Sequence, residues 1–179
     1  MLVHYKVLLR ITLLFAKSNI QLTSLIRGGG QERGKRAGTE NLPSIIGLAT
    51  ALKDAQEHMQ QNTAYITGLR DALRNGLDKI DGAGFNGSRE HCLPGTVNYS
   101  FQGVNGETLL SLLSNEGICC SSGSACSAGS LEPSHVLLAL GLSHETAKSA
   151  LRFSLCEYNT MDEVQTIITK VTEAVNRLR

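Results

Sequence analysis

The cysteine whose surroundings best suit chemistry is Cys126, which lies in a run of small and hydroxylated residues from 121 to 130. No bulky side chain interrupts this run, which is typical of an exposed loop. A thiol on such a loop can reach a bound substrate as a nucleophile, whereas a structural cysteine is normally buried among apolar side chains. The residues alone leave a nucleophilic and an inert Cys126 both open. The other four cysteines lie in or beside strand-like segments: Cys92, Cys119, Cys120 and Cys156.

A glycine-rich loop over residues 28–40 is a second candidate site, with five glycines and three cations. The spacing from Gly29 to Gly34 and Lys35 approaches a nucleotide P-loop, but Arg36 stands where that motif needs Ser or Thr for Mg²⁺. The free backbone N–H groups, the cations and the Thr39 hydroxyl still suit a phosphate that need not be part of a nucleotide. A solvated basic turn is the alternative interpretation.

Arg152 is a third candidate, because it is a cation within the apolar, strand-like residues 150–155. A guanidinium group at such a position can hold a carboxylate through two parallel hydrogen bonds. A structural salt bridge is the alternative. The histidines offer no spacing typical of a metal site, so we interpret them as solvated or packed side chains: His58, His91, His135 and His144.

The composition predicts one ordinary globular unit in a reducing compartment. The chain has 179 residues, of which 41% are hydrophobic, and its 17 basic and 16 acidic side chains leave a net charge of +1. A chain of that length can bury a core without disulfides or a structural metal. Its few aromatic residues and small net charge argue against nucleic-acid binding. Residues 11–16 form an apolar run far shorter than the roughly 20 residues of a membrane span. An odd cysteine count without a secretory signal favours the cytoplasm.

The hydrophobic pattern predicts mixed α and β structure, a small sheet with long covering helices. Residues 1–17 are expected to form one or two buried strands. Asn41 as N-cap and Pro43 behind it begin a helix that runs to about Ile80, either continuous or divided near Asn62. A turn follows at residues 81–84. We expect further strands at 96–101, 118–120 and 150–155, and helices at 107–115, from Pro133 to 140, and after the capping box from Thr160 to Glu163.

Three segments, in this order and spacing, resemble one family: GGGQERGKRAGTEN at 28–41, SSGSACSAGSLEPSH at 121–135 and LRFSL at 151–155. They resemble the pyridoxal-phosphate-dependent cysteine desulfurases, in the branch whose long cysteine loop supplies sulfur for iron–sulfur clusters and tRNA thiolation. The resemblance runs from about Ile20 to the C-terminus. It implies an α/β protein, or α+β in this isolated piece, that corresponds to the C-terminal small domain of a fold-type I transferase.

The resemblance also implies a role for each candidate residue. Cys126 is then the nucleophile, whose thiolate attacks the sulfur of L-cysteine held on the cofactor and becomes a persulfide while L-alanine leaves. Arg152 grips the substrate carboxylate. Thr39 binds the cofactor phosphate of the neighbouring subunit in a homodimer. The Cys126 persulfide passes to a sulfur-acceptor or iron–sulfur scaffold protein, where Cys126 transiently ligates the assembling cluster as a metal ligand.

The start of the chain departs from the family. Its members begin with a long cofactor-binding domain that bears the Schiff-base lysine, and residues 13–17 resemble only the strand that follows this lysine. Lys6 lies near the lysine position, but its His4-Tyr5-Lys6 setting lacks the family's His-Lys pair. We expect residues 1–19 to be a diverged stub of the cofactor domain, and residues 20–179 to be the C-terminal segment and small domain. Activity is then expected to be lost in this chain alone or to require a partner that supplies the cofactor domain.

Two other functions remain open from the residues. One is a non-enzymatic sulfur carrier or dimerisation module that uses Cys126 without the cofactor. The other is a thiol redox or metal site built from Cys119, Cys120 and Cys126. The expected partners are L-cysteine, a sulfur-acceptor protein and a second copy of the chain, with neither nucleic acid nor a membrane among them.

Overall fold

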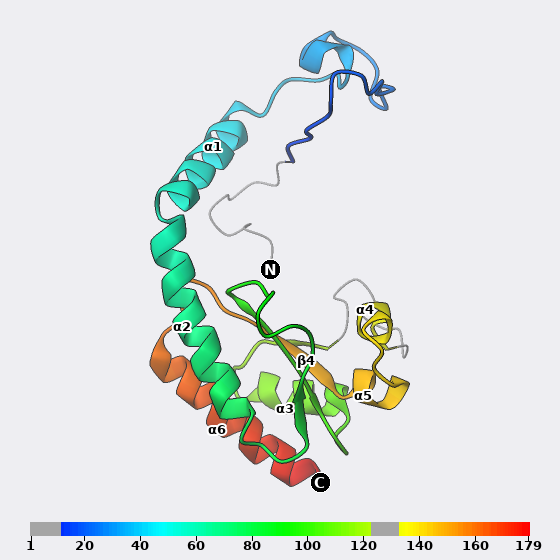
Figure 1. The fold of residues 1–179 in the computed structure, drawn as a ribbon. Coiled ribbons are helices and arrows are strands. Elements are labelled where there is room, and N and C mark those ends of the chain that lie inside the picture. The colour runs from blue at the N-terminus through cyan, green and yellow to red at the C-terminus, as the bar shows by residue number, and fades with distance from the viewer. Residues whose placement is uncertain (1–11, 123–132) are drawn as a thin grey trace. The chain divides into compact units, whose positions relative to one another are not determined.

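The computed structural model describes residues 12–122 and 133–179 (Figure 1). The chain divides into two compact units, Met1–Met59 and Gln60–Arg179. In the part of the chain that is described, no helix is long and apolar enough to cross a membrane. The elements in chain order are η1 (Gln31–Gly34), α1 (Leu42–Glu57), α2 (Met59–Leu77), β1 (Ala83–Phe85), β2 (Thr96–Phe101), α3 (Gly106–Asn115), β3 (Ser121–Ser122), α4 (His135–Ala139), α5 (His144–Lys148), β4 (Ala150–Ser154) and α6 (Met161–Leu178).

The start of the first unit does not form the strand that its apolar sequence predicts. Residues 12–17 have no regular secondary structure, and Leu13, Leu14 and Phe15 are 74%, 73% and 84% exposed. A strand needs the backbone groups of a partner strand, and the described residues of the first unit contain none. The prediction of buried strands is therefore wrong for residues 12–17. Residues 1–11 lie outside the described residues.

The helix expected over residues 41–80 is two helices, α1 and α2. Asn41 caps the start of α1, as predicted. The end of α1 is closed at His58, whose backbone N–H donates to the carbonyl oxygen of Asp54 and whose Nδ1 lies 2.9 Å from the same oxygen. The break therefore falls at His58 and not near Asn62. Neither glycine nor proline marks it, so the sequence offers no signal for its position.

The second unit is built on a four-stranded antiparallel sheet with the strand order β1-β2-β4-β3. The predicted strands at 96–101 and 150–155 are confirmed as β2 and β4. The edge strand β1 was not predicted, because the glycines at 82 and 84 indicate a turn. Gly82 does turn the chain, with a φ of 62°, but Gly84 lies in the strand opposite Ser100.

The strand expected at residues 118–120 lies instead at β3. Gly117, with a φ of 78°, ends α3, and the next amide donates back to the carbonyl oxygen of Leu113 at 2.9 Å. This arrangement satisfies a free carbonyl at the helix end. Residues 118–120 therefore leave the helix without pairing, and the ladder with β4 begins only at Ser121, opposite Arg152.

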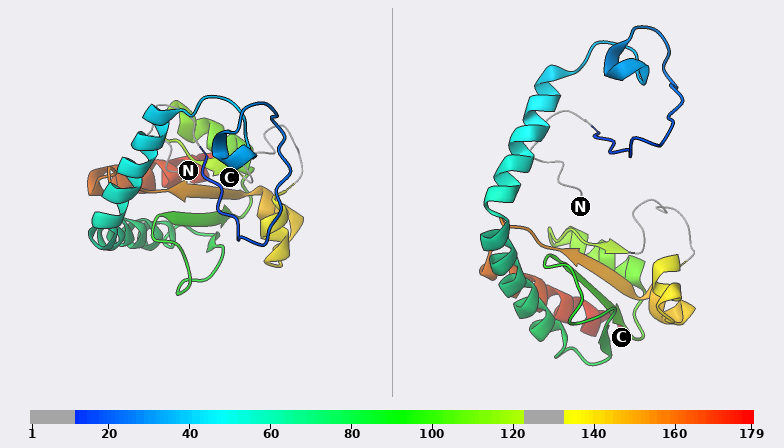
Figure 2. Two further views of the ribbon diagram at one scale, coloured as in Figure 1. Left: turned by 90° about the horizontal axis from the view of Figure 1, so that it is seen from above. Right: turned by 45° about the horizontal axis from the view of Figure 1, so that its top comes forward.

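The core lies on one face of the sheet. Val97, Tyr99 and Phe101 of β2 are fully buried, and the register sets Phe153 and Leu151 of β4 opposite the first two. Helices α2 and α6 run side by side in both Figures 1 and 2. Three helices contribute to the same core: α2 with Leu69, Leu73 and Leu77, α3 with Leu109 and Leu113, and α6 with Val164, Val171 and Val175.

The two short helices before β4 form a smaller apolar cluster. Leu137 of α4 and Ala147 of α5 pack with Ala150, the first residue of β4. Helix α4 agrees with the helix predicted after Pro133. Helix α5 was not predicted, although the side chain of its N-cap, Ser143, accepts a backbone hydrogen bond in the usual way.

The final helix, α6, begins with the predicted capping box. The Thr160 hydroxyl accepts the Glu163 backbone N–H at 3.2 Å, and the Glu163 carboxylate accepts the Thr160 backbone N–H at 2.9 Å. That backbone hydrogen bond is the main cause of a lowered pKa of Glu163. The capping box predicted from the sequence is therefore confirmed.

A charged network joins the end of α2 to β2. Both oxygens of the Asp78 carboxylate accept hydrogen bonds from Arg89, at 2.9 and 2.8 Å, and one also accepts from the Tyr99 hydroxyl at 2.6 Å. The hydrogen bond from Arg89 is the main cause of a lowered pKa of Asp78, whereas burial and then Asp78 raise the pKa of Tyr99. The guanidinium groups of Arg74 and Arg89 also lie over the Phe85 ring, at 4.9 and 5.3 Å from its centroid.

Candidate functional site

Arg152 lies in β4, which pairs with a strand on each side. Its neighbours in register are Asn98 on β2 and Ser121 on β3. Residues in register point to the same face of an antiparallel pair, and here the face is the one opposite Tyr99 and the core. Arg152 is half-buried, while Leu151 and Phe153 on either side of it are buried. Because side chains alternate along the strand, the Arg152 guanidinium group lies on the face of the sheet away from the core, which is its polar face.

On the polar face, the side chains of Asn86, Asn98 and Ser100 bond to one another, and Arg152 has no partner among the described residues. The Asn86 amide donates to the Asn98 side-chain oxygen at 2.7 Å and to the Ser100 hydroxyl at 2.8 Å. Among residues 12–122 and 133–179, no carboxylate forms a salt bridge with Arg152. The structural salt bridge that was the alternative role for Arg152 thus has no partner in the described chain. Its guanidinium group remains available to a carboxylate ligand.

The same strand pair leads directly into the segment that contains Cys126, which we name the cysteine segment. Ser121 and Ser122 are the last described residues before that segment, and they pair with Arg152 and Leu151. Cys126 itself lies outside the described residues. It lies four positions after Ser122 in the chain, which is a chain length of at most about 14 Å. The fold therefore ties Arg152 to the segment that carries Cys126, although the two residues are far apart in the sequence.

Thr39 belongs to the first unit, at the end of the glycine-rich loop. Its side chain is exposed, and its backbone carbonyl accepts from the Arg36 guanidinium group at 3.5 Å. The Gly38 backbone N–H donates to the side chain of Gln31 at 3.2 Å. Gly38 has a φ of 105°, a conformation that glycine adopts without strain. An exposed hydroxyl with exposed cations beside it, just before the N-terminus of α1, fits a phosphate group.

The cysteines of the second unit differ from what their strand-like neighbours suggested. Cys119 is exposed and Cys120 is half-buried, and both precede β3. Burial, and next the neighbouring Cys119, raise the pKa of Cys120 to about 11. Among the described residues, no group of three or more His, Cys, Asp or Glu side chains is arranged to hold a metal ion. The predicted thiol or metal site includes Cys126, which is outside those residues, as is the lysine candidate Lys6.

Comparison with known proteins shows which family the chain resembles over most of its length. The family model for aminotransferase class V matches residues 14–167. A cysteine desulfurase of Gluconacetobacter diazotrophicus is 43% identical over 167 residues, and one from a Nostoc species is 44% identical over the same length. Each match covers 93% of this chain and 42% of the relative. The chain thus spans about two fifths of the length of these curated relatives.

Solved structures give the same result for the fold. A NifS-like protein superposes with a TM-score of 0.80 at 37% identity, over 91% of this chain and 41% of that one. The NifS-like protein of Rickettsia africae superposes with a TM-score of 0.78 at 30% identity, over 88% of this chain and 41% of that one.

The chain therefore belongs to the aminotransferase class-V family, and its fold is part of the NifS-like fold. The curated relatives named above are cysteine desulfurases. The predicted fold class, a small sheet with long covering helices, is confirmed. The predicted domain boundary after residue 19 stays a prediction, as do the roles of Cys126, Thr39 and Arg152.

Proposed function

We propose that this chain carries the sulfur-accepting part of a cysteine desulfurase. In this function Cys126 takes the sulfur atom of L-cysteine as a persulfide, L-alanine is released, and the sulfur passes to an acceptor protein for iron–sulfur clusters or tRNA thiolation. Arg152 binds the substrate carboxylate. Thr39 binds the phosphate of pyridoxal phosphate in a neighbouring copy of the chain. A persulfide on Cys126 also serves as a transient ligand when a cluster is assembled on the acceptor.

The observation that best supports the proposal is the register between β3 and β4. It brings the guanidinium group of Arg152 opposite Ser121, at the root of the cysteine segment. Amino-acid substrates carry a carboxylate, and a planar guanidinium group binds carboxylates through two hydrogen bonds. A substrate held at Arg152 would thus lie within reach of the loop whose thiol must attack its sulfur. The chain is 43% identical to a cysteine desulfurase over 93% of its own length, and this similarity supports the same reaction.

The described residues fit the phosphate end of pyridoxal phosphate. Thr39 offers a hydroxyl group, and Lys35 and Arg36 offer exposed positive charge in the same loop. When bound, pyridoxal phosphate supplies an electron sink that weakens the carbon–sulfur bond of the substrate. Arg152 fixes the orientation of the substrate through its carboxylate, and the Cys126 thiolate provides the electron pair that forms the new sulfur–sulfur bond.

The proposal is tested by measuring sulfur acceptance and desulfuration separately. In one reaction the full chain is mixed with a partner that supplies the cofactor domain and is incubated with L-cysteine and pyridoxal phosphate, and L-alanine and protein persulfide are quantified. In the other, glutathione persulfide replaces both, so that only sulfur acceptance is measured. Cys126→Ala should abolish L-alanine formation in the first reaction and slow the formation of protein persulfide in the second, where the exposed Cys119 can still react. Cys156→Ala, which removes a half-buried thiol elsewhere in the second unit, is the matched control and should leave both unchanged.

The outcomes separate the desulfurase from the sulfur carrier. L-Alanine and Cys126 persulfide in equal amounts support the desulfurase. A Cys126 persulfide that forms only from glutathione persulfide supports a non-enzymatic sulfur carrier. No sulfur on Cys126 in either reaction contradicts both functions.

Arg152→Lys tests the role of the guanidinium group in substrate binding. It removes a two-point hydrogen bond to a charged group, worth about 1.5–3 kcal/mol, so the KM for L-cysteine should rise roughly 10- to 100-fold. Acceptance of sulfur from glutathione persulfide involves no amino-acid carboxylate at Arg152 and should be unchanged. An unchanged KM would show that Arg152 does not bind the substrate carboxylate.

A further inference from the structure

A row of polar side chains crosses the polar face of the sheet at the level of Arg152. The neighbours of Arg152 in register are Asn98 and Ser121. Asn86, just after β1, continues the row, and its backbone N–H donates to the Asn98 carbonyl oxygen at 2.9 Å. Side chains opposite one another on one face have Cβ atoms about 5 Å apart, so neighbours in the row are close enough to share a small ligand. We name these four residues the polar row.

Hydrogen bonds at one end of the polar row fix the orientation of the Asn98 amide. Asn86 Nδ2 donates both to Asn98 Oδ1, at 2.7 Å, and to the hydroxyl of the buried Ser100, at 2.8 Å. The acceptor end of the Asn98 amide therefore faces β1. An asparagine amide has its oxygen and its NH2 group on opposite sides of Cγ, so the NH2 group is turned away from β1, and β4 lies on that side of β2. This NH2 group has no hydrogen-bond partner among the described residues.

Asn98 and Arg152 cannot satisfy one another, because each presents only donors to the other. A guanidinium group has N–H donors and no acceptor, and the free end of the Asn98 amide likewise only donates. Within residues 12–122 and 133–179, neither group has a partner that accepts from it. An acceptor placed between them would satisfy both, and the positive charge of Arg152 favours a negatively charged one. The pair therefore matches a carboxylate, whose two oxygens both accept.

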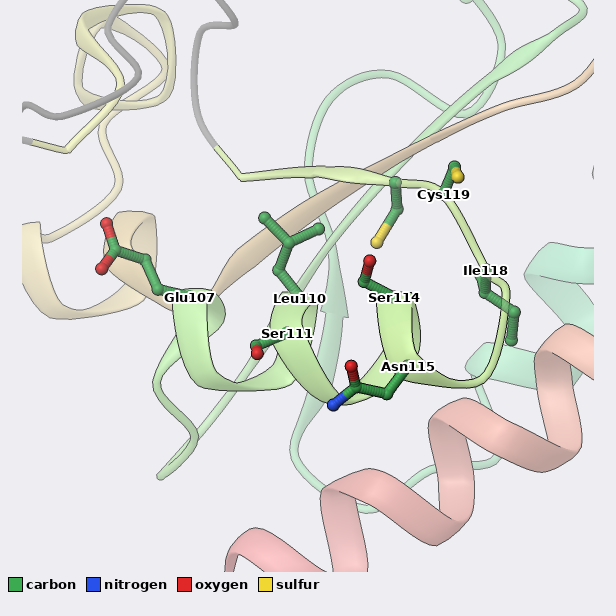
Figure 3. A pocket seen from close by; sticks show the side chains of 8 residues that line it. Glu107, Leu110, Ser111, Ser114, Asn115, Ile118 and Cys119 are labelled. Carbon is green, nitrogen blue, oxygen red and sulfur yellow. The ribbon is translucent and has the colours of Figure 1, made fainter.

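The charges of the second unit favour binding of a carboxylate at the polar row over binding in the groove along α3. Among the described residues on the polar face of the strands, Arg152 is the only charged one. The groove along α3 has a volume of about 440 Å³, and Cys119 and Cys120 lie in its wall (Figure 3). Of the described residues that line it, only Glu107 is charged, and its carboxylate repels an anion. A substrate carboxylate is thus attracted to the row and not to the groove.

We infer that Asn98 is a second residue that binds the substrate carboxylate, beside Arg152, and that Asn86 is a positioning residue that keeps the NH2 group of Asn98 free. This inference rests on the proposed function, in which Arg152 binds that carboxylate. One carboxylate oxygen accepts from Asn98 Nδ2, while the guanidinium group donates to the carboxylate from β4. Groups on two strands then fix the substrate more closely than one flexible side chain does. Without Asn86, the Asn98 amide could rotate and present its oxygen, which repels a carboxylate.

The test follows the side-chain NH2 signal of Asn98 by nuclear magnetic resonance while the full chain is titrated with L-alanine at constant ionic strength. L-Alanine carries the α-carboxylate of an amino-acid substrate and has no thiol that could react with the cysteines. A site with only a few hydrogen bonds binds weakly, with a Kd of the order of 10 mM, so the titration extends to about 0.1 M.

The titration should move two signals together. We expect the Asn98 NH2 signal and the Arg152 Nε–H signal to shift with the same Kd. L-Alaninamide, which lacks the carboxylate, should shift neither. Asn115 lines the groove along α3, and its side-chain signal is an internal control that should respond to neither compound. The wild-type titration needs no variant, so it decides the inference even where a variant fails to fold.

Variants measure each contribution through the Arg152 signal. Asn98→Ala removes one hydrogen bond to a charged group, so the Kd for L-alanine should rise about tenfold. Asn86→Ala lets the Asn98 amide rotate, so only a fraction of the molecules present the NH2 group, and the Kd should rise about twofold to threefold. The double variant should bind no more weakly than Asn98→Ala, because Asn86 acts only through Asn98. Asn115→Ala, which replaces an exposed asparagine of α3, is the matched control and should leave the Kd unchanged.

Each result decides the inference. Shifts of both signals with L-alanine alone, with weaker binding in Asn98→Ala, support it. A shift of Arg152 without one of Asn98, or an unchanged Kd in Asn98→Ala, overturns the inference and leaves the proposed role of Arg152 intact. Equal responses to L-alaninamide overturn it as well, because the carboxylate is then not the group recognised. A double variant that binds more weakly than Asn98→Ala overturns the positioning role of Asn86. No response of either signal contradicts the inference and the role of Arg152 in the proposed function together.

Discussion

Two glycines inside α2 have opposite surroundings, and replacing each by alanine should have opposite effects on stability. A Cβ atom added at Gly76 would lie 2.3 Å from Cδ1, 2.6 Å from Cγ1 and 2.9 Å from Cγ2 of Ile168 on α6. A Cβ atom added at Gly68 would meet nothing within 4 Å. Gly76 is therefore the point where α2 and α6 approach too closely for a side chain, whereas Gly68 faces open space.

The magnitudes follow from two competing effects. Alanine in a helix interior is favoured over glycine by about 1 kcal/mol, and Gly68→Ala should gain up to that amount. Gly76→Ala lies in the last turn of α2, so its gain is smaller, and it forces all three outer carbons of Ile168 to move. Overpacking of this kind costs about 1–3 kcal/mol, so we expect a net loss of roughly 1–2 kcal/mol. The two variants should thus differ by about 2–3 kcal/mol in the free energy of unfolding.

Urea unfolding followed by far-ultraviolet circular dichroism measures the difference, since the chain has no tryptophan for fluorescence. A second variant, Ile168→Ala, removes the atoms that clash. If the clash is the cause, Gly76→Ala should cost less in the Ile168→Ala background than in the wild type, with a coupling energy of at least about 1 kcal/mol. A Gly76→Ala chain as stable as Gly68→Ala would refute the close approach of α2 and α6.

Two further predictions concern hydrogen bonds of the second unit. Tyr99→Phe removes the hydroxyl that donates to Asp78, and should lower the free energy of unfolding by about 2 kcal/mol at pH 7. Because folding lowers the pKa of Asp78, its contribution is present above the unfolded pKa, near 4, and is lost as the pH falls through the folded value. The difference between wild type and Tyr99→Phe in urea unfolding should therefore shrink between pH 7 and pH 3, and a constant difference would contradict this reasoning. Thr160→Ala breaks the capping box of α6 and should cost about 1 kcal/mol, seen as a lower melting temperature, whereas Thr166→Ala, within the same helix, serves as the control.

Elements with local signals were predicted well from the sequence. The alternation of residues 96–101 and 150–155 marked two strands, and the capping box at Thr160 marked the start of α6. These signals lie within a few residues of the feature that they specify. The break at His58 and the strand β1 had no such signal, and the sequence led to a different expectation at both places.

The candidate site divides in the same way. The sequence by itself determined which residues have reactive or charged groups, including Cys126, Thr39 and Arg152, because the residue types and their neighbours carry that information. Only the tertiary structure decided that Arg152 faces Ser121 across the sheet, and that Cys119 and Cys120 line a groove with α3. Strand register and helix packing depend on contacts between segments distant in the chain, so no local pattern of residues could specify them.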